Sequence, residues 1–253
     1  MTGRSMLAVL IPSCALLASS GGCSKPRKYK QLTDIPSSAY TVVKKHSNGA
    51  FKLIKVKRAL WLRGMLIKPT WGDVEAYEDG RLAVAQPAQP VTIDGFKARG
   101  GAAVSFDREG KLSTLHLAEP LTVGKVKVPQ GAWVRVHDGK VIVASDKKSL
   151  RAIFRPNGEQ IPTQGPIIEK SSSGAYGGTL AKDAAFGALT CKAGTFVFFA
   201  ANGKPTVCTL AKEATIGGKQ YAANTGLKLD DKGAVTGSYD PNKPPVTLKT
   251  KAP

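Results

Sequence analysis

The stretch GKLSTLHLAEPLTVG, residues 110–124, has a near-copy in GKPTVCTLAKEATIG, residues 203–217. Both copies begin and end with glycine, and both place a Leu-Ala pair seven residues after the first glycine. A stretch that recurs in this way indicates a unit of construction, so its period is the first evidence for the fold.

Glycines recur along the chain at the period of this unit. One set is spaced 29 to 35 residues apart and consists of Gly49, Gly80, Gly110, Gly139, Gly174, Gly203 and Gly233. A second set lies 13 to 19 residues into each unit and consists of Gly64, Gly95, Gly124, Gly158, Gly187 and Gly217. A third set precedes the next apolar stretch and consists of Gly72, Gly101, Gly131, Gly165, Gly194 and Gly226. This spacing predicts tandem units of about 30 residues.

Each unit contains the pattern of a β-hairpin. Apolar and polar residues alternate before the first glycine, as in AWVRVH (132–137), and a second such run follows it, as in KLSTLHL. Between the runs, four units carry Asn-Gly or Asp-Gly: Asn48-Gly49, Asp79-Gly80, Asp138-Gly139 and Asn202-Gly203. These dipeptides suit a two-residue turn in which both residues have positive φ. We therefore expect each glycine of the first set at a hairpin tip.

The rest of the unit completes an all-β prediction. Around the second glycine we expect a third, short strand or a tight connection, and we expect a loop at DKKSLRAIF, residues 146–154. The predicted fold is an antiparallel β-hairpin array over residues 41–240. A β-helix with glycine corners is the alternative, and Asn-Gly and Asp-Gly favour the array because they reverse the chain.

This unit logic, over residues 49–239, loosely resembles that of MORN and related β-hairpin repeat proteins. The present unit is longer than the MORN unit and lacks its Tyr/Trp-rich hairpin signature. The resemblance therefore implies a hairpin array and transfers no MORN function.

The first residues have the pattern of a secretory signal. In residues 1–22, Arg4 precedes an apolar run, and small residues then lead directly to Cys23. This arrangement resembles the lipobox of bacterial lipoproteins, in which the cysteine is acylated, with palmitate for example, and becomes the first residue of the mature chain. Ser20 departs from the aliphatic residue that the family prefers there. The resemblance implies a lipid anchor at Cys23, and Ser24 in place of Asp implies the outer membrane; an ordinary cleaved signal peptide is the alternative.

The net charge of the chain indicates the sign of the charge on its partner. The chain carries 37 Lys and Arg against 18 Asp and Glu, a formal net charge of +19 at pH 7, which favours anionic partners. We expect residues 23–40 to form a lipidated basic tether beside anionic headgroups and residues 241–253 a flexible Pro/Lys-rich tail. The expected partners are the membrane, through the anchor, and anionic lipid, lipopolysaccharide or peptidoglycan. An envelope location argues against nucleic acid.

No residues have the spacing of a catalytic or metal-binding motif. The three histidines, His46, His116 and His137, fall at unrelated repeat positions. We therefore predict no catalytic residue, no metal and no cofactor. Cys191 and Cys208 are candidates for a disulfide, because they lie on neighbouring predicted strands and an exported protein meets an oxidising compartment; otherwise both are small core residues.

The tryptophans bear on the choice between two functions. Packing in strands is favoured over a glycan-stacking platform for Trp61, Trp71 and Trp133, because aromatic residues are common in strands. The expected function is a non-enzymatic cell-envelope lipoprotein whose basic β-repeat surface binds or scaffolds anionic envelope components. The alternative is a surface-exposed module that recognises a glycan or a protein.

Overall fold

The computed structural model describes residues 26–146, 150–170, 175–200 and 202–241. The predicted signal segment 1–22, the acylation site Cys23, the hairpin glycine Gly174 and nearly all of the tail lie outside the described residues. The described chain is all-β, with three short 3-10 helices and no α-helix.

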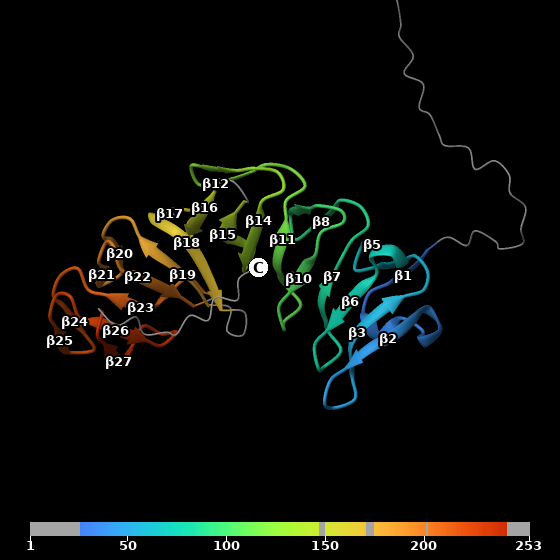
Figure 1. Cartoon of the computed structure of the whole chain (residues 1–253), viewed down its shortest axis with the longest axis horizontal. Helices are drawn as coiled ribbons and strands as arrows, with labels where there is room; N and C mark the ends of the chain where they lie inside the picture. Colours follow the sequence, from blue (N-terminus) through green and yellow to red (C-terminus); the bar gives the residue numbers. More distant parts are fainter. Residues whose placement is uncertain (1–25, 147–149, 171–174, 201, 242–253) are drawn as a thin grey trace, which may run out of the picture.

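Two large antiparallel sheets contain most of the strands, and the strands follow one another in chain order across the molecule (Figure 1). The ten-stranded sheet consists of β2 (Tyr40–Lys45), β3 (Phe51–Val56), β6 (Asp73–Ala76), β7 (Leu82–Ala85), β10 (Val104–Phe106), β11 (Leu112–His116), β14 (Trp133–His137), β15 (Lys140–Ser145), β16 (Arg151–Phe154) and β17 (Gln160–Ile161). The six-stranded sheet consists of β18 (Thr163–Lys170), β19 (Ala175–Leu180), β22 (Phe196–Phe199), β23 (Pro205–Thr209), β26 (Gly226–Leu229) and β27 (Val235–Tyr239). The predicted antiparallel hairpin array is confirmed, and the β-helix alternative is wrong.

Small side hairpins connect the large hairpins and lie along the outer rim of the arc in Figure 1. They are β4–β5 (Leu60–Leu62, Met65–Ile67), β8–β9 (Val91–Ile93, Phe96–Ala98), β12–β13 (Leu121–Val123, Val126–Val128), β20–β21 (Ala184–Phe186, Leu189–Cys191) and β24–β25 (Ala214–Ile216, Lys219–Tyr221). Their two-residue turns contain Gly64, Gly95, Gly124, Gly187 and Gly217. The second glycine therefore marks two short strands, where we expected one strand or a connection.

The large hairpins turn differently from the expectation. At the tip between β10 and β11, Gly110 (φ 80°) donates its N–H to the Asp107 carbonyl at 3.0 Å, and the strand register shifts by one residue. This is a type I turn followed by a glycine bulge. The same bonds recur at Gly49, Gly80, Gly203 and Gly233. Of the four Asn-Gly and Asp-Gly dipeptides predicted at tips, only Asp138-Gly139 forms the two-residue turn with two positive φ angles, 47° and 71°.

Asparagine and aspartate before the glycine have another role in these bulged turns. The side-chain oxygen of Asn48 accepts the N–H of Ala50 at 3.0 Å, and Asn202 accepts that of Lys204 at 3.0 Å. Asp79 does the same for Arg81. The dipeptide therefore supplies a side-chain acceptor and a glycine with positive φ, and the Asn or Asp itself needs no positive φ.

The middle unit departs from the repeat. Gly158 is the tip of the hairpin between β16 and β17, with its N–H donated to the Arg155 carbonyl at 2.9 Å, so it belongs with the tips and not with the second set. Residues 151–154, expected as part of a loop, form β16 because their buried side chains alternate between two cores. The unit has no side hairpin in the described residues.

The glycines of the third set do not all occupy the same position in their units. Gly101, Gly131 and Gly194 have positive φ at the corner that leads back into a large sheet. In the last unit Asn224 (φ 64°) takes this position, and Gly226 begins β26. Gly165 lies inside β18.

The basic segment that we expected as a flexible tether is folded from residue 26 onward. Strand β1 (Arg27–Tyr29) pairs in parallel with β4, and two 3-10 helices follow, Leu32–Asp34 and Ser37–Ala39. Leu32, Ile35 and Ala39 are buried in the first core. These apolar side chains explain the difference, because they close the end of the array despite the surrounding lysines.

The described chain has two hydrophobic cores, and β15 and β16 contribute to both. Ala144 and Ala152 point into the first core, which is formed mainly by residues 32–154. Val143 and Ile153 point the other way, into the second core. The six-stranded sheet therefore packs against the opposite face of the ten-stranded sheet at β15 and β16.

Candidate binding groove

A row of side chains crosses four strands of the ten-stranded sheet near their ends. His116 of β11 pairs with Trp133 of β14, Trp133 with Ser145 of β15, and Ser145 with Arg151 of β16. Directly opposed residues of antiparallel strands project from the same face. Because the adjacent Leu115 points into the first core, the row lies on the opposite face.

Trp71 lies near this row, in the 3-10 turn Pro69–Trp71 that precedes β6. Its indole covers Gly101 of the next unit so closely that a Cβ on Gly101 would lie 2.1 Å from Cζ3 of the ring. Gly101 also has a φ of 75°. This corner therefore requires glycine for two separate reasons. Trp71 is 45% exposed, and it is the one exposed aromatic side chain among the described residues.

Trp71 and Trp133 line the same hollow. Its volume is about 620 Å³, and its lining also includes Arg99, His116 and Asp146. The lining thus comes from the corners of three successive units. This size falls within the range of ordinary ligand sites.

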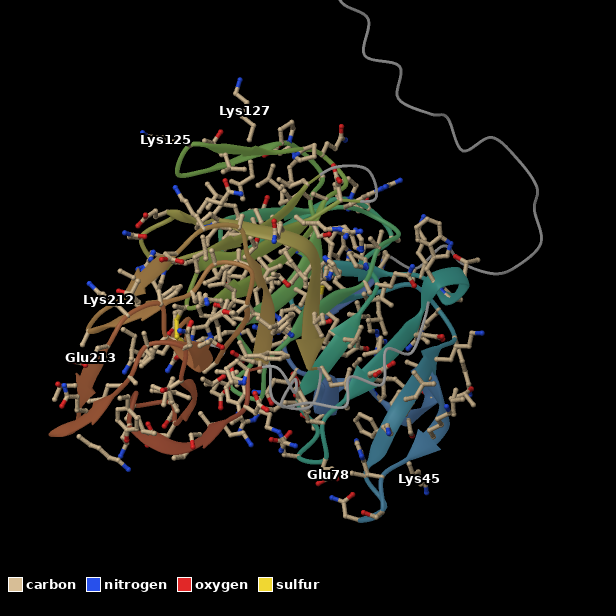
Figure 2. The ribbon with its side chains drawn as sticks, turned by 60° about the vertical axis from the view of Figure 1, so that its left-hand side comes forward. Lys45, Glu78, Lys125, Lys127, Lys212 and Glu213 are labelled. Carbon is tan, nitrogen blue, oxygen red and sulfur yellow. A yellow bond between two sulfur atoms is a disulfide. The ribbon has the colours of Figure 1, made fainter. Side chains whose placement is uncertain are left out.

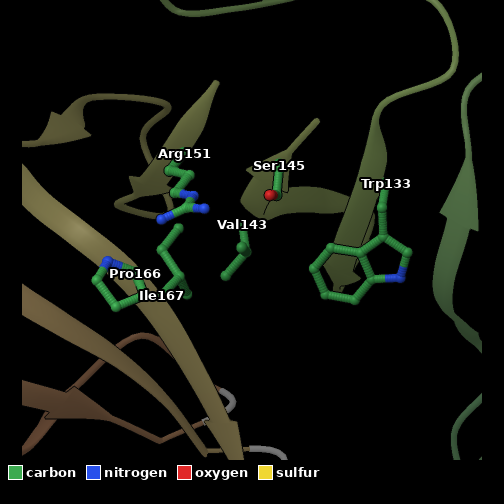
Figure 3. A pocket seen from close by; sticks show the side chains of 6 residues that line it. All are labelled: Trp133, Val143, Ser145, Arg151, Pro166 and Ile167. Carbon is green, nitrogen blue, oxygen red and sulfur yellow. The ribbon is translucent and has the colours of Figure 1, made fainter. Parts of the chain in front are cut away.

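A second hollow of about 410 Å³ adjoins the first through Trp133 and Ser145. It lies between the row and β18, where Figure 3 shows Trp133 on one side and Pro166 and Ile167 on the other, with Arg151 above them. The pairing of β18 with β19 slips between Gln164 and Ile168, which is a bulge that tolerates proline. We call the two hollows together the Trp groove.

Two arginines give the Trp groove its charge. Arg99 and Arg151 are exposed, and neither forms an ion pair with another residue in the described part of the chain. The Arg99 guanidinium lies near Gly131, whose carbonyl is 3.3 Å from Nδ1 of His116. The described lining therefore combines two indole rings, two guanidinium groups and one carboxylate, that of Asp146.

His116 and Ser145 both line the groove, and their separation bears on catalysis. A nucleophilic serine needs its base within hydrogen-bonding distance. Trp133 stands between them in the row, so their backbones are two strand spacings apart, about 10 Å. Within the described residues, the histidine and the serine form no hydrogen bond with each other.

The other two histidines lie near hairpin tips. His46 Nε2 is 2.9 Å from the Ala76 carbonyl, which ties its turn to the next unit. His137 lies 3.5 Å from the carboxylate of Asp138, to which Lys111 donates a hydrogen bond of 2.7 Å. This bond, followed by the charge of His137, lowers the pKa of Asp138 below its ordinary value. These contacts link successive units.

Cys191 and Cys208 form a disulfide in the second core, with their Cα atoms 5.5 Å apart. The bond joins side hairpin β20–β21 to β23 of the next large hairpin. Both cysteines are fully buried. Closing a loop of this length typically stabilises a protein by about 3 kcal/mol.

The described residues contain neither a metal-binding cluster nor a membrane-spanning helix. No cluster of three or more His, Cys, Asp or Glu side chains in this part of the chain could hold a metal ion. Over the same residues, no helix has the length and the apolar character needed to span a membrane.

Exposed lysines extend from the side hairpins. Lys125 and Lys127 of β12–β13 project away from the rest of the chain (Figure 2). Neither has an ion pair or a hydrogen bond with any described residue. By contrast, Lys97 of the preceding side hairpin pairs with Glu119 at 2.7 Å.

A third hollow, of about 500 Å³, lies on the six-stranded half between the large hairpin tips and the side hairpins. Lys204 and Lys232 line it, together with Arg155, whose guanidinium lies 4.5 Å from the centre of the Phe186 ring. Its lining contains no acidic residue. Basic side chains thus line hollows on both halves of the array, and Arg155 among them pairs with Glu159 at 3.3 Å.

No protein-family model, curated protein or solved structure matches this chain. From the sequence we expected Trp71 and Trp133 to be packing residues, and neither Arg99 nor Arg151 was expected in a site. One feature of the sequence could have identified Trp71 as a site residue. It lies in the corner KPTWGD and not in an alternating run typical of a strand.

Proposed function

We propose that the chain is a non-enzymatic lipoprotein of the cell envelope whose basic β-repeat surface binds an anionic envelope component. The observation that carries this proposal is the exposed pair Lys125 and Lys127, which project on one hairpin without a described acidic partner. The formal net charge of +19 gives the whole chain the same preference.

The arrangement suits a polyanion better than a single small anion. The side hairpins repeat along one rim of the array (Figure 1), and three of them carry lysines, namely Lys97, Lys125 and Lys127, and Lys219. These lysines therefore form separate charges and not one pocket. A repeated surface of this kind contacts an extended partner at several points. Phosphate or carboxylate groups displayed on an envelope lipid or polymer provide the matching charges.

Sequence features support the envelope location. Residues 1–22 resemble a lipoprotein signal, and Cys23 follows at the position that the family acylates. A lipid anchor next to a basic domain would hold the domain close to anionic headgroups, where each cation contributes about 1 kcal/mol.

Salt-dependent binding tests the proposal. The full chain is titrated with polyphosphate, and with phosphatidylcholine vesicles that contain or lack phosphatidylglycerol, so that the contribution of the anchor cancels. The test variant is Lys125→Gln/Lys127→Gln, and the charge-preserving Lys125→Arg/Lys127→Arg is its matched control. We expect the Gln variant to lower the affinity at least about tenfold at low salt, and the Arg variant to leave it unchanged.

The two kinds of probe separate the possible sources of the anion. A lysine effect confined to vesicles with phosphatidylglycerol identifies the lipid headgroup, and an effect on polyphosphate identifies a soluble or polymeric anion. Binding that is indifferent to salt and to both lysines would contradict the proposal.

A further inference from the structure

We propose that the Trp groove is a binding site for an acidic polysaccharide, with Trp71 and Trp133 stacking on sugar rings and Arg99 and Arg151 pairing with its carboxylates or phosphates. This inference rests on the proposed function and names the site and the ligand class.

Trp71 is the first reason to propose that the Trp groove binds sugar rings. A single exposed apolar side chain needs no explanation, but this indole is held against a glycine in a left-handed conformation. Trp71 is 45% exposed and lines a hollow that Trp133 also lines. Two indole rings in one open groove suit the apolar face of a pyranose ring.

The two arginines of the groove are the second reason, because they indicate a ligand with negative charge. Arg99 lies in the hollow with Trp71, and Arg151 lies in the adjoining hollow on the other side of Trp133. Arginine is well suited to carboxylate and phosphate, because its planar guanidinium can form two parallel hydrogen bonds with either group. Neither arginine is neutralised by an ion pair within the described residues. The described lining holds two guanidinium groups against one carboxylate, that of Asp146, and this positive balance favours sugar units that carry negative charge.

The form of the groove argues for a polymer. Its lining is drawn from the corners of three successive units and from β18, so it extends across the array and is not one enclosed cavity. A lipid would need an apolar channel for its acyl chains, whereas this lining mixes two indole rings with the polar side chains of Arg99, His116, Ser145, Asp146 and Arg151. A chain of charged sugars fits this mixture.

Calorimetric titration of the full chain with three probes tests the site. Oligogalacturonate carries both rings and charge, polyphosphate carries charge alone, and a malto-oligosaccharide carries rings alone. The variants are Trp71→Ala and Arg99→Gln. Val43→Ala is the matched control, because Val43 is also an exposed apolar side chain, 51% exposed on β2, and lies outside the groove.

We expect oligogalacturonate to bind tightest, and each groove variant to weaken this binding about tenfold while Val43→Ala leaves it unchanged. Trp71→Ala should leave polyphosphate binding unchanged. The inference is overturned if Trp71→Ala does not affect oligogalacturonate binding, or if oligogalacturonate binds no better than polyphosphate. Either result leaves the lysine-dependent binding of polyphosphate intact, so failure of the groove is distinguishable from failure of the proposed function.

Discussion

At the residue scale, Asn48, Asp79 and Asn202 explain why the repeat prefers Asn-Gly and Asp-Gly. Each accepts the backbone N–H of the residue after the glycine, within a bulged type I turn. The dipeptide located these tips correctly but did not identify the turn type, because it is compatible with both kinds of turn. Asn157-Gly158 carries the same signal, and Asn157 accepts the N–H of Glu159 at 3.1 Å.

Tyr176 gives a prediction at this scale. Its side chain is fully buried, burial raises its pKa, and its hydroxyl has no hydrogen-bond partner in the described part of the chain. Removing an unsatisfied buried hydroxyl costs nothing, so Tyr176→Phe should leave the free energy of unfolding unchanged or raise it by about 1 kcal/mol. Chemical denaturation of the full chain measures this.

Tyr239 provides the matched control. Its hydroxyl lies 3.0 Å from the hydroxyl of Thr209, which is almost completely buried. Tyr239→Phe breaks this bond and should lower the free energy of unfolding by about 1 kcal/mol. A greater loss from Tyr176→Phe than from Tyr239→Phe would mean that the Tyr176 hydroxyl has a partner after all.

At the scale of elements, one side hairpin is packed against the interruption in the repeat. A Cβ on Gly124, in the turn of β12–β13, would lie 2.3 Å from the carbonyl oxygen of Gly158, at the tip of β16–β17. In the next side hairpin, Gly187 occupies the equivalent turn position and has nothing within 4 Å of such a Cβ. The two glycines have similar φ angles, 56° and 64°.

This contrast predicts different costs for the same substitution. Gly124→Ala and Gly187→Ala should each lose about 1 kcal/mol of stability because alanine disfavours positive φ. Gly124→Ala should lose about 1–3 kcal/mol more, because its methyl group overlaps backbone that cannot rotate away. Denaturation midpoints of the two variants decide this, and equal losses would show that the hairpins do not meet at these glycines.

The elements also mark the limit of prediction from the sequence. Hairpins were predictable because alternation and Asn-Gly are local signals. Strand β16 was not, since residues 152–154 are buried on both faces and therefore lack a clean alternation. The segment around Leu32 looked flexible because it is mostly polar and contains Pro26 and Pro36, although its few apolar residues decide its packing.

At the scale of the whole molecule, the Trp groove depends on which units lie beside one another. Trp71, Trp133 and Arg151 are far apart in the sequence and meet only through the registers of β14, β15 and β16 and the corners of neighbouring units. A period in the sequence predicts that units stack, but it does not give the residues that line the space between them. The packing of the second core was also not predictable from the period, and it brings Pro166 and Ile167 to one side of the groove.

The central claim is that this face of the array meets an acidic polysaccharide in the envelope. The most direct measurement places a photoreactive amino acid at position 71 of the full chain, in the cells that make the protein, with the same substitution at position 43 as the control. The account predicts that irradiation at position 71 gives conjugates that contain uronic acid or sugar phosphate and that collapse on glycosidase treatment, and that position 43 gives none. Conjugates at position 71 that contain only protein or only lipid would contradict it.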